Sequence, residues 1–253
     1  MPDLAPDFRR IPLAHRGLHG AGLPENSLAA ARAAIAAGYG IECDLQLAAD
    51  GVPMVFHDDE LGRLTGRTGR VDALTAAELA RLPLGGTAET IPTLADLLDL
   101  VAGRVPLLIE IKDQTGTLSP GPDRLEDATA AVLAAYRGPV ALMSFNPHSV
   151  AALARLAPGI ARGLTSCAFP AWDWPLPVER RAALAALGDF DAVGASFVSH
   201  DRADLANPAV LALKARGVPI LCWTVRGAEA EARARAVADN ITFEGYAPAI
   251  PAA

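Results

Sequence analysis

The sequence predicts an α/β protein with a (β/α)8 TIM-barrel fold. Short runs rich in β-branched and apolar residues alternate with alanine-rich amphipathic segments, which is the pattern of successive βα units around a parallel sheet. Eight such runs can be counted, and 253 residues is a usual length for one barrel of this kind. We therefore expect a single barrel domain over residues 1–253. An open, doubly wound sheet is the alternative, because a strand count alone does not establish closure.

The predicted strands are the apolar runs at 11–16, 39–47, 105–112, 139–145, 160–165, 192–198, 218–225 and 240–245. Most are followed by a helical segment with clear start signals. Ser27, Asn146 and Asn207 are candidate N-caps, and Pro147 and Pro208 suit the first helical position. The order of elements thus supports repeated βα units.

A ninth run, residues 52–57, follows the dipeptide Asp50-Gly51, which is a strong hairpin signal. We expect this run to fold back on the second strand and to bring His57 near the end of the strand that carries Glu42. Residues 58–104 then interrupt the rhythm, with short helices predicted at 74–82 and 93–103. They are expected to form a small insertion between the second and third barrel strands.

Charge and composition exclude several classes of function. The net charge of −7 and the isoelectric point near 5.2 argue against a nucleic-acid partner, which a basic face would bind. The start of the chain has no secretory signal and no apolar run reaches membrane-spanning length, so a cytoplasmic protein without stable membrane insertion is expected. The three cysteines form no CxxC pair, which argues against redox chemistry. No signature of a homo-oligomer is present, and that question stays open.

Acidic residues gather in two of the predicted strands. Side chains alternate along a strand, so Glu42 and Asp44 share one face, as do Glu110 and Lys112 in the next barrel strand. Ionised carboxylates in a buried strand are costly without a cation, which favours a bound hard metal ion. In the alternative interpretation Glu110 pairs with Lys112 and the other two acids lie at a strand tip. Their joint occurrence on neighbouring strands favours the metal.

Two histidines complete a candidate site. His15 and Arg16 close the first strand, where barrel enzymes place catalytic groups. His15 can exchange a proton near neutral pH, and the Arg16 guanidinium matches phosphate oxygens. With His57, two histidines flanking a metal-bound phosphate could supply a base and an acid, as phosphodiester cleavage requires.

Several motifs together resemble those of the glycerophosphodiester phosphodiesterases. They are HRG (15–17), PENS (24–27), ECD (42–44), DGVPMVFHDD (50–59), EIK (110–112), SFN (144–146) and CWTV (222–225). Each motif is short, but their order and spacing are specific, and the resemblance covers nearly the whole chain.

The resemblance implies a role for each candidate residue. A divalent ion, Mg²⁺ or Ca²⁺, would be held by Glu42, Asp44 and Glu110. The general acid/base pair would be His15 and His57. Phosphate oxygens would be bound by Arg16 and Lys112. Glu25 is a further candidate for metal or water positioning, and Trp223 either walls the pocket or packs in the core.

Two features depart from the family or have no assigned role. Near the end of the chain the family's acid appears one position late, as Glu244, which suggests a small insertion or an altered pocket wall. The segment 170–177 contains Trp172 and Trp174 on the face where barrel loops build active sites. A lid, an apolar platform and a contact with a partner subunit all remain open for it.

The expected function is metal-dependent hydrolysis of a small glycerophosphodiester to glycerol 3-phosphate and an alcohol such as choline or ethanolamine. The nucleophile is either water or the substrate's own glycerol hydroxyl. One alternative is a lysophospholipase D, which needs the same groups and an apolar groove. The other is a non-catalytic phosphodiester-binding module, against which the two proton-transfer groups argue.

Overall fold

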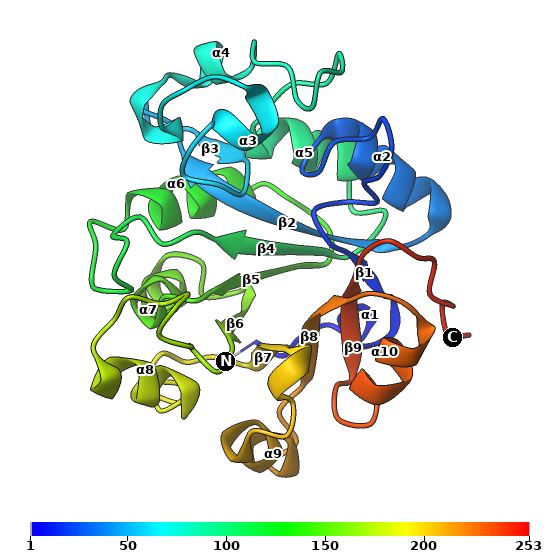
Figure 1. The fold of residues 1–253 in the computed structure, drawn as a ribbon, viewed down its shortest axis with the longest axis vertical. Coiled ribbons are helices and arrows are strands. Elements are labelled where there is room, and N and C mark those ends of the chain that lie inside the picture. Colours follow the sequence, from blue (N-terminus) through cyan, green and yellow to red (C-terminus); the bar gives the residue numbers. More distant parts are fainter. Residues whose placement is uncertain (1, 253) are drawn as a thin grey trace.

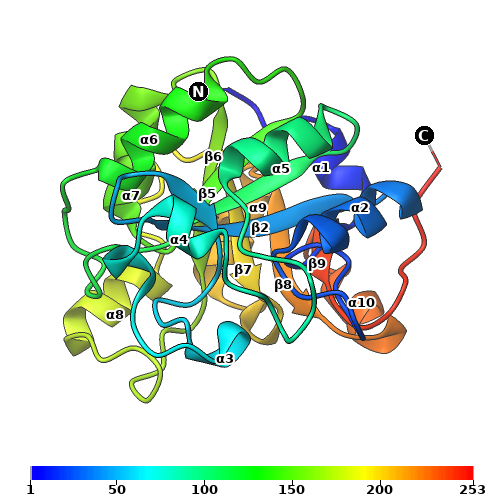
Figure 2. The same ribbon diagram turned by 90° about the horizontal axis from the view of Figure 1, so that it is seen from above.

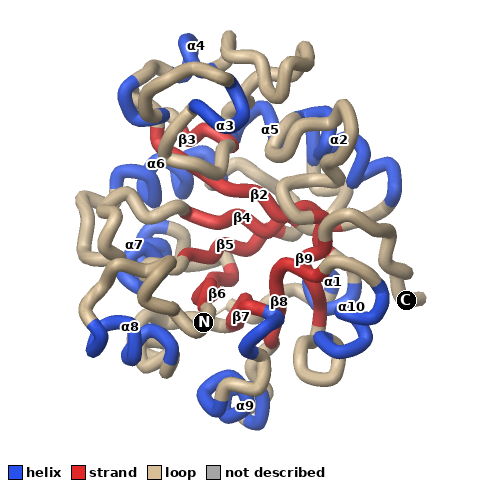
Figure 3. The backbone as a smooth tube through the Cα atoms, in the orientation of Figure 1, coloured by secondary structure: helices blue, strands red, loops and turns tan. Residues whose placement is uncertain are grey.

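The computed structural model describes residues 2–252 and confirms the predicted closed barrel (Figures 1 and 3). The parallel barrel strands are β1 (Leu13–Ala14), β2 (Gly40–Leu47), β4 (Leu107–Ile111), β5 (Val140–Ser144), β6 (Ala161–Ser166), β7 (Phe197–Asp201), β8 (Ile220–Val225) and β9 (Asn240–Phe243). Leu13 of β1 pairs with Gly40 of β2 on one side and with Thr242 of β9 on the other. This double pairing closes the ring and excludes the open sheet.

Helices surround the barrel, as the view from above in Figure 2 shows. They are α2 (Leu28–Ala37), α5 (Leu94–Val101), α6 (Arg124–Leu133), α7 (Pro147–Leu156), α8 (Val178–Ala185), α9 (Pro208–Ala215) and α10 (Ala228–Ala234). The side chains of Ser27, Asn146 and Asn207 accept hydrogen bonds from the first helical turns of α2, α7 and α9, as predicted.

The insertion lies at one end of the molecule and is cyan in Figure 1. It follows β3 (Pro53–Val55), which pairs antiparallel with β2 as the hairpin signal predicted. The short elements α3 (Gly62–Thr65), η1 (Val71–Ala73) and α4 (Ala76–Leu79) follow. Helix α4 is shorter than the predicted 74–82, because Thr75 caps it and the chain turns after Ala80. The insertion and the β2–β3 hairpin share an apolar cluster, comprising Ala48, Met54, Phe56, Leu61, Val71, Leu79, Leu84 and Ile91.

The prediction for the sixth barrel strand, β7, was wrong in its position along the chain. The predicted strand covered residues 192–198, whereas β7 is Phe197–Asp201. Residues 191–194 form a turn in which Gly194 adopts a left-handed conformation with φ +66°. Strand β7 therefore carries His200.

The amino-terminal end of the barrel is filled by apolar side chains. Phe197 lies fully buried there, and a Cβ at Gly163 on the neighbouring strand would lie 2.5 Å from its ring. Helix α1 (Asp7–Arg10) adds Phe8 to this cluster, and the Asn240 side-chain amide donates to the Phe8 carbonyl oxygen. Apolar packing closes the amino-terminal end of the barrel, and the polar side chains lie at the carboxyl-terminal end.

His200 is buried in a polar network outside the barrel lumen. Its Nδ1 lies 2.7 Å from Ser166 Oγ, and its Nε2 lies 3.1 Å from Asp204 Oδ2. Burial lowers the pKa of His200 below its usual 6.5, although Asp204 opposes the shift. The unfolded chain therefore binds a proton more readily than the folded chain does. The free energy of unfolding consequently decreases as the pH drops below 6.5.

Replacing His200 with Ala is expected to destabilise the fold by about 2 kcal/mol, through a cavity and the lost partner of Ser166. Urea unfolding at pH 7.5 measures this loss. The exposed His148 on α7 provides the control, and His148→Ala should change the free energy of unfolding by less than about 0.5 kcal/mol. Equal effects of the two substitutions would contradict the structural role of His200.

Candidate active site

The carboxyl ends of the barrel strands surround a cavity of about 330 Å³. Parallel strands present these ends at one face of a barrel, so residues distant in sequence meet there. Eight residues singled out from the sequence line it: His15, Arg16, Glu42, Asp44, His57, Glu110, Lys112 and Trp223. The structure thus brings the candidate residues together, with the exception of Glu25.

Three carboxylates form the most buried part of the cavity wall. Glu42, Asp44 and Glu110 offer oxygen atoms that all lie within 4.8 Å of one another, and their exposed fractions are 2%, 1% and 6%. Burial raises the pKa of Glu42 well above its ordinary value, and the charges of the other two acids add to the shift. Hard oxygen ligands that repel one another in this way fit a divalent cation such as Mg²⁺ or Ca²⁺.

Lys112 is the main cation beside these acids. Its Nζ lies 2.8 Å from Asp44 Oδ1 and 2.6 Å from Glu110 Oε1. Although burial opposes both shifts, this pairing raises the pKa of Lys112 and contributes to lowering that of Asp44. The pairing of Glu110 with Lys112, raised as an alternative to a metal site, is therefore present. It leaves Glu42 without an ammonium partner among the described residues.

Arg16 approaches the acids from the loop after β1. Its backbone N–H donates to Glu42 Oε2 at 3.0 Å, and its Nε lies 3.5 Å from Asp44 Oδ2. The residue is held in a left-handed conformation with φ +54°, in which its carbonyl oxygen accepts from the N–H of Asn26. Both the main chain and the side chain of Arg16 are thereby directed toward the carboxylates.

Glu25 lies behind Arg16 and outside the cavity lining. Its carboxylate binds Arg16 at 2.6 Å and Arg63 at 2.7 and 2.9 Å. Burial opposes ionisation, but these guanidinium groups lower the pKa of Glu25. The neighbouring Asn26 has the closer contact with the cluster, since its Nδ2 donates to Asp44 Oδ2 at 2.9 Å.

His57 follows the hairpin of β2 and β3, which places it beside the cavity. Its Nδ1 lies 2.7 Å from Asp58 Oδ1, and Asp58 is held in turn by Arg63 at 2.6 Å. Gln46 on β2 donates to the His57 carbonyl oxygen. Burial lowers the pKa of His57, although the charge of Asp44 opposes the shift. The ring is therefore oriented by a carboxylate beside the cavity.

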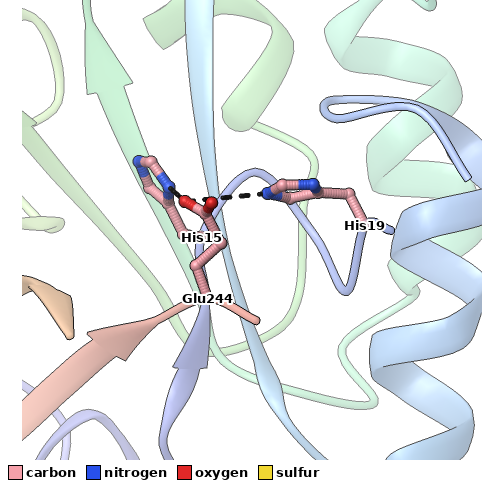
Figure 4. A group of neighbouring side chains, drawn as sticks. All are labelled: His15, His19 and Glu244. Carbon is pink, nitrogen blue, oxygen red and sulfur yellow. Dashed lines mark hydrogen bonds and ion pairs between the residues drawn. The ribbon is translucent and has the colours of Figure 1, made fainter. Parts of the chain in front are cut away.

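His15 has a similar carboxylate partner, drawn from the other end of the chain. Its Nδ1 lies 3.0 Å from Glu244 Oε2, which also accepts from Arg226 at 2.9 Å. Figure 4 shows the Glu244 carboxylate between the rings of His15 and His19, with His19 Nε2 3.9 Å away. The hydrogen bond with His15 lowers the pKa of Glu244 to about 2, against the effect of burial. Each cavity histidine is thus anchored through Nδ1.

Three residues of this arrangement were not singled out for such contacts from the sequence: Asn26, Asp58 and Glu244. Each had a signal, since Asn26 stands within PENS, Asp58 follows His57, and Glu244 is the acid that comes one position late. The structure shows that the late acid meets His15.

Within residues 2–252, no helix combines the length and the apolar composition that crossing a bilayer requires.

Comparison with known proteins agrees with the geometry. The profile of the glycerophosphoryl diester phosphodiesterase family matches residues 15–239. A glycerophosphodiester phosphodiesterase of Caldanaerobacter subterraneus is 32% identical over 167 residues, which cover 62% of this chain and 67% of the relative. A putative glycerophosphodiester phosphodiesterase of Bacillus subtilis is 28% identical over 89% of this chain and 90% of its own.

A solved structure adds the spatial comparison. A phosphodiesterase of Oleispira antarctica, in complex with the product sn-glycerol-3-phosphate, superposes with a TM-score of 0.75 at 27% identity. The match covers 92% of this chain and 93% of that one. The enzyme class that the sequence predicted, a phosphoric diester hydrolase, is confirmed by these comparisons. The chain belongs to the glycerophosphoryl diester phosphodiesterase family.

Proposed function

We propose that this chain hydrolyses small glycerophosphodiesters to glycerol 3-phosphate and an alcohol, with the help of a divalent cation. The observation that carries the proposal is the joint presence of three buried carboxylates and two anchored histidines around one cavity. A phosphodiester-binding module would have no need of two proton-transfer groups in this arrangement.

In this proposal Glu42, Asp44 and Glu110 hold Mg²⁺ or Ca²⁺. When bound, the ion would supply Lewis-acid polarisation of the phosphodiester. Lys112 and Arg16, which lie against the same acids, bind the phosphate oxygens and stabilise the negative charge that grows in the transition state. Glu25 keeps the Arg16 guanidinium in position through its short ion pair.

His15 and His57 move the protons. An imidazole whose Nδ1–H donates to a carboxylate has Nε2 available, as an acceptor when neutral and as a donor when protonated. One ring removes the proton from the nucleophile, and the other protonates the departing alcohol. Trp223 forms part of the cavity wall, where its indole N–H is fixed by the Ser199 carbonyl oxygen at 3.0 Å.

Glu244 acts in this scheme by orienting His15. Replacing Glu244 with Gln is expected to lower kcat about 10-fold with KM nearly unchanged, because the ring loses its anionic partner but phosphate binding is retained. The pH profile of kcat should shift as well, which a purely structural residue would not cause. Glu229→Gln, on the exposed face of α10, is the control. An increase in KM with an unchanged kcat would refute the orienting role.

The proposed function is tested by following the products of glycerophosphocholine and glycerophosphoethanolamine by ³¹P NMR. Appearance of glycerol 3-phosphate in the presence of Mg²⁺ or Ca²⁺ would support the proposal. Appearance of phosphocholine, or no reaction with either metal, would contradict it. A transient cyclic phosphate signal would identify the glycerol hydroxyl as the nucleophile in place of water.

A further inference from the structure

A second hollow opens beside the catalytic cavity. This groove, which we call the His57-side groove, has a volume of about 710 Å³. It shares five lining residues with the cavity, namely His57, Glu110, Lys112, Phe145 and Trp223. His15 lines the cavity but not the groove. A phosphodiester at the carboxylates therefore has room to extend one of its two substituents into this groove.

One wall of the groove is aromatic. Phe145 packs against Trp174 with ring centroids 4.9 Å apart, and against Trp223 at 5.6 Å. Trp174 also contacts Phe169, which is buried. The segment 170–177 therefore contributes Trp174 to the groove, whereas Trp172 is 85% exposed and lines neither the groove nor the cavity. The apolar platform left open by the sequence is the alternative that fits these contacts.

The remaining lining mixes apolar and acidic side chains, and its apolar members are Ile111, Leu118, Pro175 and Leu176. The groove is bordered by the carboxylates of Asp58, Asp59, Glu60, Asp113 and Asp173. Lys112 is the one lysine or arginine among the described residues that line it, and its ammonium is already bound by two acids of the cluster. Arg63 offsets Asp58, and Arg70 lies 3.9 Å from both Asp59 and Glu60. Asp173 has no cation within ion-pair distance among residues 2–252. The groove thus combines exposed aromatic faces with an excess of negative charge.

We propose that the His57-side groove receives the departing alcohol of the substrate and selects a cationic alcohol, above all one with a quaternary ammonium group such as choline. This inference rests on the proposed function and specifies its substrate class. Aromatic faces attract an ammonium group by cation–π interaction, and nearby carboxylates add attraction over several ångströms. A neutral alcohol gains neither contribution. An acyl chain would contact the apolar part of the lining but would also cover the carboxylates at a desolvation cost.

The test compares kcat/KM for glycerophosphocholine and glycerophosphoglycerol, whose departing alcohols are cationic and neutral. The wild-type ratio is expected to be about 10 in favour of choline. Trp174→Leu should lower kcat/KM for the choline substrate about 5-fold and leave the glycerol substrate within about 2-fold. Trp172→Leu, in the same loop but exposed, is the matched control and should leave the ratio unchanged.

A second variant is needed because Trp174 also packs against buried rings, so Trp174→Leu would give no answer if it failed to fold. Asp173 is exposed, so Asp173→Lys is expected to fold normally. It should lower the choline-to-glycerol ratio several-fold through charge reversal alone. Thermal unfolding of each variant identifies any loss of folded protein.

Equal kcat/KM values for the two substrates in the wild type would overturn the inference, as would variants that lower both equally. A preference for lysophosphatidylcholine over glycerophosphocholine that Trp174→Leu abolishes would also overturn it and assign the groove to an acyl chain. Failure of the proposed function has a different signature, since no glycerol 3-phosphate would then be released from any of the three substrates.

Discussion

Replacing Glu42 with Gln is expected to lower kcat/KM by roughly three orders of magnitude while the folded state remains at least as stable in EDTA. A metal ion contributes several kcal/mol to transition-state stabilisation, and a neutral amide is a poor ligand for a hard divalent cation. In the absence of metal, however, burial and two neighbouring acids raise the pKa of Glu42, so its ionised form is costly. An uncharged amide of similar shape removes that cost.

Thermal unfolding with and without Mg²⁺ or Ca²⁺ separates these two effects. The ion should raise the Tm of the wild type, because it binds the folded chain, and should leave the Tm of Glu42→Gln nearly unchanged. Glu126 is the matched control, since it is also a buried glutamate with a raised pKa but lies on α6 outside the cavity. Glu126→Gln should retain activity and the metal-induced rise. A metal-responsive and active Glu42→Gln variant would disprove the assignment of the ligand.

Replacing His57 with Ala is expected to lower kcat by about 10² to 10⁴-fold, the usual contribution of a positioned proton-transfer group. The side chain is 32% exposed, so the free energy of unfolding should change little. The metal-induced rise in Tm should persist, because His57 is not one of the three clustered carboxylates. This combination distinguishes loss of proton transfer from loss of the metal.

Steady-state kinetics on the purified variant measure the effect, with thermal unfolding as a check on folding. His148→Ala controls for removal of an imidazole, since His148 is exposed and lines neither the cavity nor the groove. If His57→Ala kept kcat within about twofold of the wild type, the histidine pair could not be the acid and base of the reaction.

Much of the fold could be predicted because its signals are local. Alternating side chains put Glu42 and Asp44 on one strand face, and the Asp50-Gly51 turn predicted the hairpin that carries His57. The sixth barrel strand, β7, was misplaced because the apolar residues at 192–195 resemble a strand, whereas residues 191–194 form a turn that contains Gly194. Local composition does not distinguish a turn that contains apolar residues from the start of a buried strand.

The contacts that orient the site could not be predicted in the same way. His15 and Glu244 are 229 residues apart, and Asn26 reaches Asp44 across the first βα loop. Strand periodicity indicates which face a side chain occupies, but the partner depends on barrel closure and side-chain length. The longer glutamate, one position after the expected acid, reaches His15 through such a contact. The groove beside His57 likewise depends on how the 170–177 loop packs.

The central claim is that the carboxylate cluster makes this chain a divalent-metal-dependent glycerophosphodiester hydrolase. The most direct test is to deplete the purified protein of metal and titrate Mg²⁺ or Ca²⁺ while measuring release of glycerol 3-phosphate from glycerophosphocholine. The account predicts negligible release from the depleted protein and saturable recovery with added ion, absent in Glu42→Gln. Full activity of the metal-depleted protein would contradict it.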